Sequence, residues 1–271
     1  MSAILNRVLQ SLALILWGGT LVAFHASGRM VKYLAPDFRT LALGGGLGLI
    51  VLGLFCLLTA RRKADCGHDH GPGDAHDHES LDIHPLGAFL IMVAPVALAV
   101  VWTTDGYSVA ALTRKGLDDS PQESGLFLAS TLPPLTKEII ESQHPPDKNG
   151  YREFPLLDLY FSSGDPEMIG LVEGMQVVTD GRVVDDPDPH APAAQRRLYR
   201  LFITCCAADS RPIAIIVRFE EPAPEFEENE WVRLSGTITF PDEGEGRQAV
   251  LDVDFPEIVP APPEESFMRG Y

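Results

Sequence analysis

The sequence predicts a helical membrane domain of about three spanning segments, followed by an acidic and mostly β domain. Three apolar stretches before Thr103 are long enough to cross a hydrocarbon core, which takes roughly 20 residues and as few as about 17. Charge lies mainly elsewhere: residues up to Thr103 carry 7 basic and 7 acidic side chains, whereas the whole chain has a net charge of −17. Residues 1–103 are therefore the predicted transmembrane domain, and the excess of acidic side chains lies C-terminal to it.

The three predicted spans are apolar and contain no Asp, Glu, Lys or Arg. They are Val8–Phe24, Leu41–Ala60 and Leu86–Trp102. The first span lies at the position of a signal peptide. However, no clean small-x-small cleavage site follows it, and two more spans come after it, so we expect that this helix is retained. The lipid bilayer is then the expected surroundings of all three segments.

Glycines in the first two spans suggest how the helices pack. Gly44 and Gly48 have the small-xxx-small spacing of a helix packing face, with Gly18, Gly19 and Gly53 nearby. General tolerance of glycine in membrane helices explains the same pattern. Both interpretations stay open at this point.

The basic residues between the spans set the expected orientation. The cluster Arg61–Lys63 directly follows the second span and favours a cytoplasmic position for that loop. Arg29, Lys32 and Arg39 lie on the opposite side and act against it. We expect the N-terminus inside and the C-terminal domain outside the cytoplasm.

A histidine-rich loop, residues 64–84, separates the second and third spans. Its candidate metal ligands are Cys66, His68, His70, His76, His78 and His84. Neutral imidazole is the commonest side-chain metal ligand, and His alternating with Asp suits zinc, nickel or copper(II). No spacing of a closed structural zinc site is present. The loop is thus predicted to be a flexible chelator of zinc or another divalent transition metal, or else a solvated polar loop that binds metal incidentally.

The C-terminal part changes from helical to period-two patterning. Residues 104–160 read as a juxtamembrane and linker region, and residues 161–271 as the acidic β domain. Five segments in it look like strands: Met175–Val184, Arg197–Cys205, Ile213–Glu220, Trp231–Phe240 and Ala249–Val259. Five short strands predict a small barrel, OB-like as the first choice. The strong acidity argues against nucleic acid as a partner.

Two adjacent cysteines, Cys205 and Cys206, are the most unusual local feature of this domain. On a strand, neighbouring side chains point to opposite faces, so the two sulfurs are expected to diverge. Cys205 would then share the apolar face of Leu201 and Ile203, leaving Cys206 more available. Two interpretations stay open. Cys206 has a metal or redox role together with Asp209, or both cysteines are small residues of the core.

A shared pattern extends over several segments, which are Ser27–Pro36, the histidine-rich loop, Arg114–Gly116, Gly174–Gly181, Arg200–Asp209 and Trp231–Gly236. Together these segments resemble the YcgQ-like family of bacterial permease subunits. The Cys-Cys-Ala-Ala-Asp run at 205–209 is the most specific of them. The end of the chain, Glu264–Tyr271, differs from the Pro-Tyr-rich finish of that pattern.

The resemblance implies the second subunit of a two-component permease in the cell (inner) membrane. Its larger multi-span partner would be a separate protein, and some members of the family are linked to zinc homeostasis. The leading hypothesis is therefore an accessory, metal-handling subunit of a transporter and not an enzyme. The alternatives are a membrane-anchored thiol or redox enzyme using Cys206, and a membrane-anchored scaffold for protein interactions.

Overall fold

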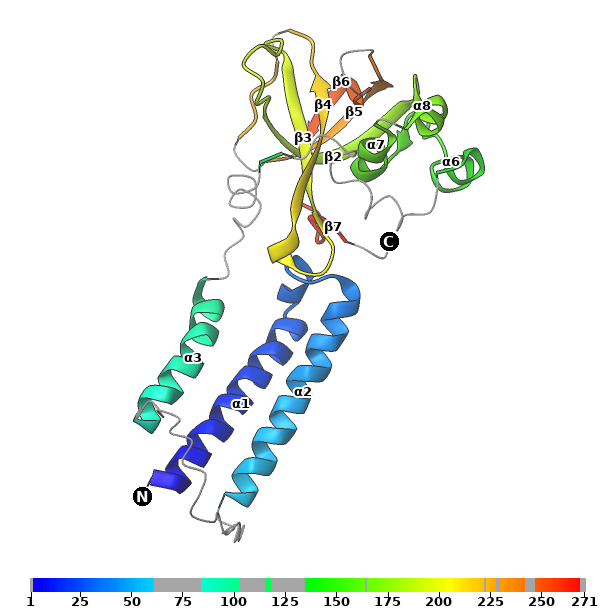
Figure 1. The fold of residues 1–271 in the computed structure, drawn as a ribbon. Coiled ribbons are helices and arrows are strands. Elements are labelled where there is room, and N and C mark those ends of the chain that lie inside the picture. The colour runs from blue at the N-terminus through cyan, green and yellow to red at the C-terminus, as the bar shows by residue number, and fades with distance from the viewer. Residues whose placement is uncertain are drawn as a thin grey trace, which may run out of the picture. The chain divides into compact units, whose positions relative to one another are not determined.

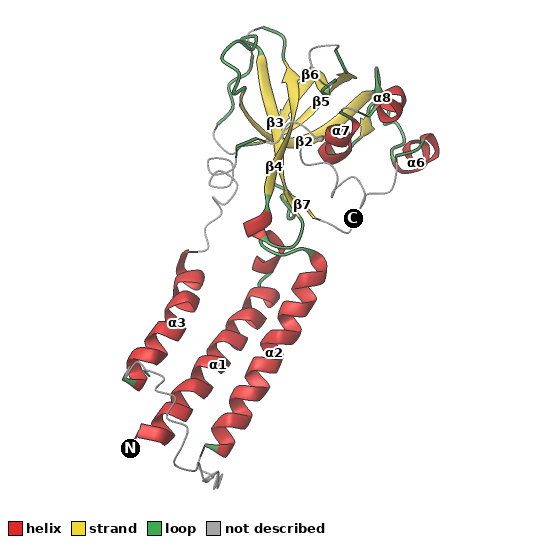
Figure 2. Ribbon diagram, viewed as in Figure 1, coloured by secondary structure: helices red, strands yellow, loops and turns green. Residues whose placement is uncertain are grey.

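The computed structural model describes residues 2–60, 84–102, 116–117, 135–163, 165–221, 223–227, 230–241 and 247–268. The chain divides into two compact units, Met1–Thr104 and Asp105–Tyr271. The first unit is helical and the second mostly β (Figures 1 and 2).

The helical unit consists of three long helices and one short turn of 3-10 helix. These are α1 (Ser2–Ala26), η1 (Arg29–Lys32), α2 (Pro36–Thr59) and α3 (Pro85–Trp102). Gly28, at φ 72°, takes the left-handed conformation that ends the α1 region, and Pro36 opens α2 where its missing N–H costs no helical hydrogen bond. Both α2 and α3 contact α1, and the indole N–H of Trp17 donates to the carbonyl of Met92 at 2.9 Å.

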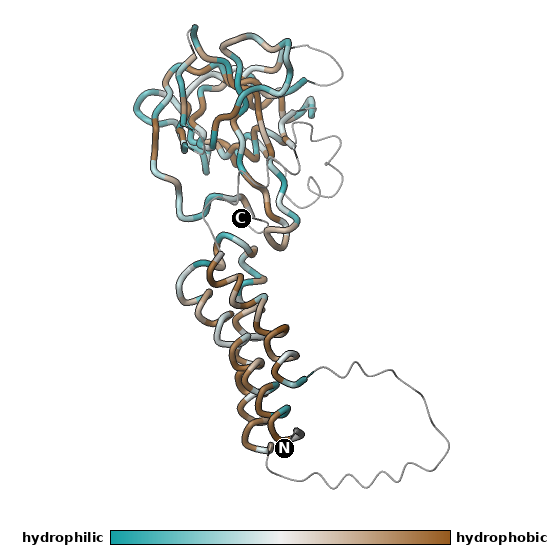
Figure 3. The backbone as a smooth tube through the Cα atoms, turned by 90° about the vertical axis from the view of Figure 1, so that its left-hand side faces the viewer, coloured by the Kyte–Doolittle hydropathy of each residue, from teal (hydrophilic) through white to brown (hydrophobic). Residues whose placement is uncertain are grey.

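Two of these helices are long and apolar enough to cross a membrane. The segments are Ile4–Ala26 and Pro36–Thr59, whereas the apolar part of α3, Pro85–Val101, is shorter. Most of their large apolar side chains are exposed, for example Leu58 at 80%. Apolar residues run along the whole length of the helices (Figure 3). The unit is therefore compatible with membrane anchoring through two helices, and the third predicted span is an apolar helix of lesser length.

Close packing of α1 and α2 uses a different set of glycines from the predicted face. A Cβ added at Gly18 would collide with the carbonyl oxygen of Gly46, and one at Gly53 would lie 2.7 Å from Cγ1 of Ile15. Gly44 and Gly48 have no such neighbour within 4 Å. The predicted Gly44 and Gly48 face is not the contact between α1 and α2, because these positions lie on other sides of α2.

The second unit contains three short helices and seven strands among its described residues. The helices are α6 (Lys137–Gln143), α7 (Leu156–Ser162) and α8 (Pro166–Val172), with the 3-10 turn η3 (Ala207–Asp209). The strands are β1 (Arg152–Glu153), β2 (Gln176–Asp185), β3 (Gln195–Ile203), β4 (Arg211–Arg218), β5 (Trp231–Thr239), β6 (Val250–Ile258) and β7 (Ser266–Met268). The five strands expected from the sequence correspond to β2 to β6. The prediction of a mostly β domain is confirmed.

Strand pairing follows the order β1-β2-β5-β6-β4-β3-β7, with a further pairing of β2 with β3. Each of β2 to β6 thus has a strand on both sides, so the pairings form a ring. β4 and β6 run parallel, while the other pairs within the ring are antiparallel. The β5–β6 register shifts between Ser235 and Gly236, where a Cβ on Gly236 would collide with the carbonyl oxygen of Asp252.

The core of this unit begins before residue 161. Alternate strand residues such as Val177, Leu234 and Leu251 are fully buried. α7 adds Leu159 and Tyr160, which are equally buried and lie within the stretch 104–160 expected to be juxtamembrane or linker. Short helices are hard to detect by periodicity, and here tertiary packing, not propensity, stabilises α7.

Candidate functional site

The turn between β3 and β4 carries the two adjacent cysteines. β3 ends at Ile203, and η3 follows after Thr204, Cys205 and Cys206. Both carboxylate oxygens of Asp209 bind this turn: Oδ1 accepts the N–H of Thr204 at 3.2 Å, and Oδ2 accepts that of Cys205 at 2.7 Å. The N–H of Asp209 donates back to the carbonyl of Cys206 at 3.0 Å. Asp209 therefore fixes the backbone on which both thiols stand.

The two sulfurs lie together, which corrects the expectation that they diverge. Their Sγ atoms are 3.7 Å apart, and both cysteines are free and half-buried. The prediction that Cys205 is buried with Leu201 and Ile203 is wrong as well. Both errors have one cause, since strand alternation no longer applies once β3 has ended at Ile203.

The surroundings of Cys205 keep its thiol protonated at neutral pH. Its hydrogen bond to Asp209 and then its contact with Cys206 raise the pKa of Cys205 to about 11. Reactive cysteines are thiolates with lowered pKa values. Cys205 is therefore poorly suited to be a nucleophile, and a metal bound here would have to displace its proton.

A second cluster gathers residues from three segments of the family resemblance. The indole of Trp231, 3% exposed, has the guanidinium carbons of Arg182 and Arg200 at 4.8 and 5.2 Å from its ring centroid. Arg200 also pairs with Asp180 at 3.5 Å. Burial, the largest cause, lowers the pKa of Arg200.

The same cluster also binds the segment that contains Glu264, Glu265 and Phe267. Arg182 forms an ion pair with Glu265 at 2.7 Å, and Arg200 donates to the carbonyls of Glu264 and Glu265. The guanidinium of Arg200 lies 4.0 Å from the ring centroid of Phe267, in β7. The stretch that departs from the family pattern thus has a structural role here, which the sequence alone did not signal.

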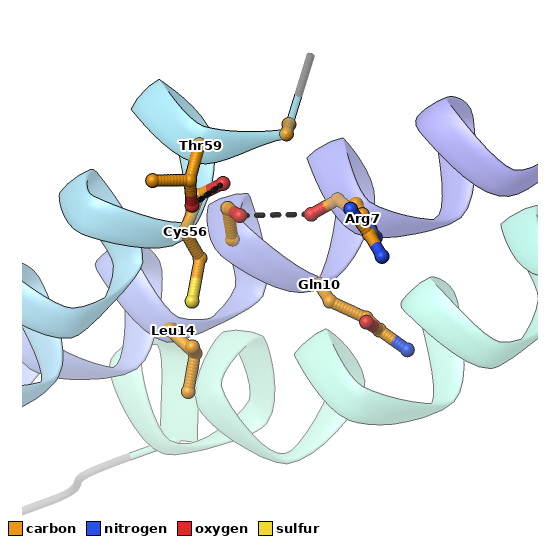
Figure 4. Close-up of a pocket in the computed structure, with 7 residues that line it drawn as sticks. Arg7, Gln10, Leu14, Cys56 and Thr59 are labelled. Atoms are coloured by element: carbon orange, nitrogen blue, oxygen red, sulfur yellow. Dashed lines mark hydrogen bonds between the residues drawn. The ribbon is translucent and has the colours of Figure 1, made fainter. Parts of the chain in front are cut away.

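A cavity of about 310 Å³ lies between α1 and α2 (Figure 4). It is lined by Arg7, Gln10, Ser11, Leu14, Cys56, Thr59 and Ala60. The hydroxyls of Ser11 and Thr59 are satisfied within their own helices, by the carbonyls of Arg7 and Phe55. Ala60 is the last described residue before the histidine-rich segment, so this cavity lies at the end of α2 from which that segment starts.

Most of the predicted metal ligands fall outside the described residues. These are Cys66, His68, His70, His76 and His78. His84 is described and exposed, and its Nδ1 accepts the N–H of Leu86 at 3.3 Å in the first turn of α3. Within the described ranges, no three His, Cys, Asp or Glu side chains are arranged to hold a metal ion.

Fold and sites together define a two-part protein, with an apolar helical unit and a mostly β unit that bears a pair of adjacent cysteines. Residues 9–117 match the DUF1980 N-terminal domain, and residues 168–265 match the DUF1980 C-terminal domain. The chain therefore contains both DUF1980 domains, which is consistent with the YcgQ-like resemblance. No curated protein matches the chain.

Proposed function

We propose that this protein is the accessory subunit of a two-component membrane permease that handles a divalent transition metal, with zinc as the first candidate. The observation that carries the proposal is the segment 64–84, where five histidines and Cys66 lie between two apolar helices. Imidazole and thiolate ligands suit zinc and its neighbours better than magnesium or calcium. A chelator tethered at both ends between membrane helices would concentrate metal at the membrane surface.

The helical unit supports a three-span arrangement in the cell (inner) membrane. α3 has 18 residues, which at about 1.5 Å per residue gives about 27 Å, close to the roughly 30 Å of a hydrocarbon core. With three spans, the histidine-rich segment and the β unit face opposite sides of the bilayer. Arg61–Lys63 then favours a cytoplasmic histidine segment and an extracytoplasmic β unit.

The size and surface of the helical unit support an accessory role beside a larger subunit. Three helices are too few for a pathway built from paired repeats. Large apolar side chains remain exposed on α2 and α3, including Val51, Phe55, Leu90, Ile91 and Val101. The proposed occupants of this surface are lipid and the helices of a multi-span permease subunit.

The β unit supports the OB-like interpretation through its ring of pairings. Five strands, β2 to β6, each pair on both sides, and β4 and β6 run parallel. We infer a small OB-like barrel. A thiol enzyme that used Cys205 as its nucleophile is less well supported, because the pKa of this thiol is raised and an activated cysteine has a lowered pKa.

Purification of the tagged chain from native membranes in mild detergent tests the proposal. The expected result is a stoichiometric multi-span partner and bound zinc. Joint substitution of His68, His70, His76 and His78 by Ala should remove most of the zinc and keep the partner. Substitution of the exposed His190 by Ala is the matched control and should change neither. A wild-type complex without a multi-span partner, or with no zinc, contradicts the proposal.

Reporter fusions test the topology separately. A fusion after Lys63 should report the cytoplasm, and one after Gly150 should report the opposite side. Fusions that report the same side would rule out three spans. Reversed reports would place the histidine segment outside the cell.

A further inference from the structure

We propose that Cys205 and Cys206 form a two-thiolate half-site for a soft divalent cation such as zinc or cadmium, with Asp209 as a positioning residue and not a ligand. This inference rests on the proposed metal-handling function and names a second metal site for it. It is separate from the histidine-rich segment, which belongs to a different unit of the chain.

The spacing of the two sulfurs fits a bridging metal. Zinc binds thiolate at about 2.3 Å, so the sulfur-to-sulfur edge of a tetrahedral site is about 3.8 Å. The Sγ atoms of Cys205 and Cys206 are 3.7 Å apart. A disulfide would need roughly 2.05 Å between sulfurs and at least about 4.4 Å between Cα atoms, whereas adjacent Cα atoms are about 3.8 Å apart. The geometry of the two cysteines is therefore better suited to chelation of one ion than to a disulfide bond between them.

Asp209 holds the pair in this position. Each of its carboxylate oxygens already accepts a backbone N–H, from Thr204 and from Cys205. The turn is closed by the antiparallel strands β3 and β4, which pair up to Phe202 and Arg211. A carboxylate bound in this way orients the thiols and does not add a third ligand.

Two protein ligands leave the remaining coordination positions to water or to a ligand from another molecule. Structural zinc sites are closed by four protein ligands, whereas open sites exchange what they bind. When the ion binds, two sulfur-to-metal bonds form and both thiol protons pass to solvent. The half-site would therefore suit transfer of metal and not its permanent storage.

The test uses the full-length protein in detergent, with the candidate ligands of the histidine-rich segment and all other thiols removed. Cys56 and Cys66 are changed to Ser, and His68, His70, His76, His78 and His84 to Ala, so that Cys205 and Cys206 are the only thiols. Cadmium is the probe, because thiolate-to-cadmium charge transfer absorbs in the ultraviolet. The expected result is one cadmium per chain with this absorbance, displaced by excess zinc.

Three substitutions in this background identify the ligands. Cys205→Ser and Cys206→Ser should each weaken cadmium binding by more than about 100-fold, since even outer-shell changes typically cost about 10–100-fold. Asp209→Asn should keep the absorbance of both sulfurs, because the Asp209 carboxylate is not a ligand. The matched control Asp188→Asn removes a carboxylate from another turn and should change nothing.

Bridging of the pair by phenylarsine oxide provides a measurement that needs no change at either cysteine. One equivalent should block cadmium binding completely. No thiolate absorbance with cadmium, or an absorbance that survives loss of both cysteines, overturns the half-site. Because the histidine ligands are absent here, failure of this test leaves the zinc result of the histidine segment untouched, and the reverse also holds.

Discussion

The helical unit and the β unit place their apolar side chains in opposite ways. Among the described residues, every large exposed apolar side chain except Phe255 and Ile258 lies in the helical unit, whereas the extended core lies in the β unit. Burial from water stabilises the β unit by itself. The helical unit lacks such a core among its described residues, and its exposed apolar side chains are compatible with an apolar environment around it.

Polar groups show the same contrast. In α1 and α2, the hydroxyls of Ser11, Thr20 and Thr59 donate to the carbonyl four residues earlier in the same helix. In the β unit, ion pairs such as that of Arg182 with Glu265 join distant parts of the chain. Helices in lipid must satisfy their polar groups within the protein, here within the same helix. A domain with its own core can use ion pairs between distant residues to stabilise one topology.

A pair of identical substitutions tests the first contrast most strongly. Leu234 in β5 is 0% exposed and Leu58 in α2 is 80% exposed. Leu234→Ala should lower the free energy of unfolding by about 2–5 kcal/mol, and Leu58→Ala by no more than about 0.5 kcal/mol. Thermal unfolding in detergent, followed by near-ultraviolet circular dichroism, measures both. An equally large effect at Leu58 would mean that another protein surface covers it.

Two neighbouring ion pairs test the second contrast within the β unit. Asp186 pairs with Arg197 at 2.9 Å and its side chain is 3% exposed, while Asp185 pairs with Arg196 and is 92% exposed. Asp186→Asn should cost about 3 kcal/mol, because it removes the counter-charge of a buried guanidinium. Asp185→Asn should cost less than about 1 kcal/mol. Urea unfolding of both variants measures the difference.

The same pair predicts a pH dependence. Burial alone would raise the pKa of Asp186, but hydrogen bonds from Gln195, the N–H of Asp188 and Arg197 lower it overall. A lowered folded pKa means that the contribution is complete above the unfolded value of about 3.9 and is lost as the pH falls below it. The stability difference between wild type and Asp186→Asn should therefore shrink in acid, and a difference that is constant from pH 7 to pH 2 would contradict this account.

The packing of α1 against α2 depends on which glycines of α2 lie in their contact. A Cβ at Gly46 would lie 3.0 Å from the carbonyl oxygen of Gly18, whereas Gly48 has no neighbour within 4 Å. Gly46→Leu should separate α1 from α2 and cost about 1–3 kcal/mol, while Gly48→Leu should be neutral in the isolated chain. Unfolding in sodium dodecyl sulfate measures the difference. If only Gly48→Leu disrupts the proposed complex with a permease subunit, that face of α2 contacts the proposed partner.

The smallest expected effect is on reactivity at the cysteine turn. Asp209→Asn removes the carboxylate whose hydrogen bond is the main cause of the high pKa of Cys205, about 11 in the folded protein. The pKa of this thiol should fall toward its ordinary value, so iodoacetamide should modify Cys205 faster at pH 9. Mass spectrometry of the labelled peptide measures the rate. An unchanged rate would show that Asp209 does not control this thiol.

Much of the architecture could be read from patterns that are local in sequence. Long apolar runs predicted α1, α2 and α3, and period-two alternation predicted β2 to β6. Both patterns can be recognised from the sequence because each repeats within a single element. The histidine-rich composition of residues 64–84 and the adjacency of Cys205 and Cys206 are also properties of the sequence alone. These features are enough to predict two units and candidate metal ligands.

Only the tertiary structure determined the features that depend on the register of a single residue or on contacts between distant parts of the sequence. The end of β3 at Ile203, two residues earlier than predicted, brought the sulfurs of Cys205 and Cys206 within 3.7 Å. Gly46, and not Gly48, meets Gly18 because the rotation of α2 is set by its neighbour. Arg200 and Glu265 come together only when β7 joins β3. Side-chain periodicity indicates which residues lie on the same face of a helix or strand. Packing across the whole unit sets the residue at which an element ends and the side chains that cover each face.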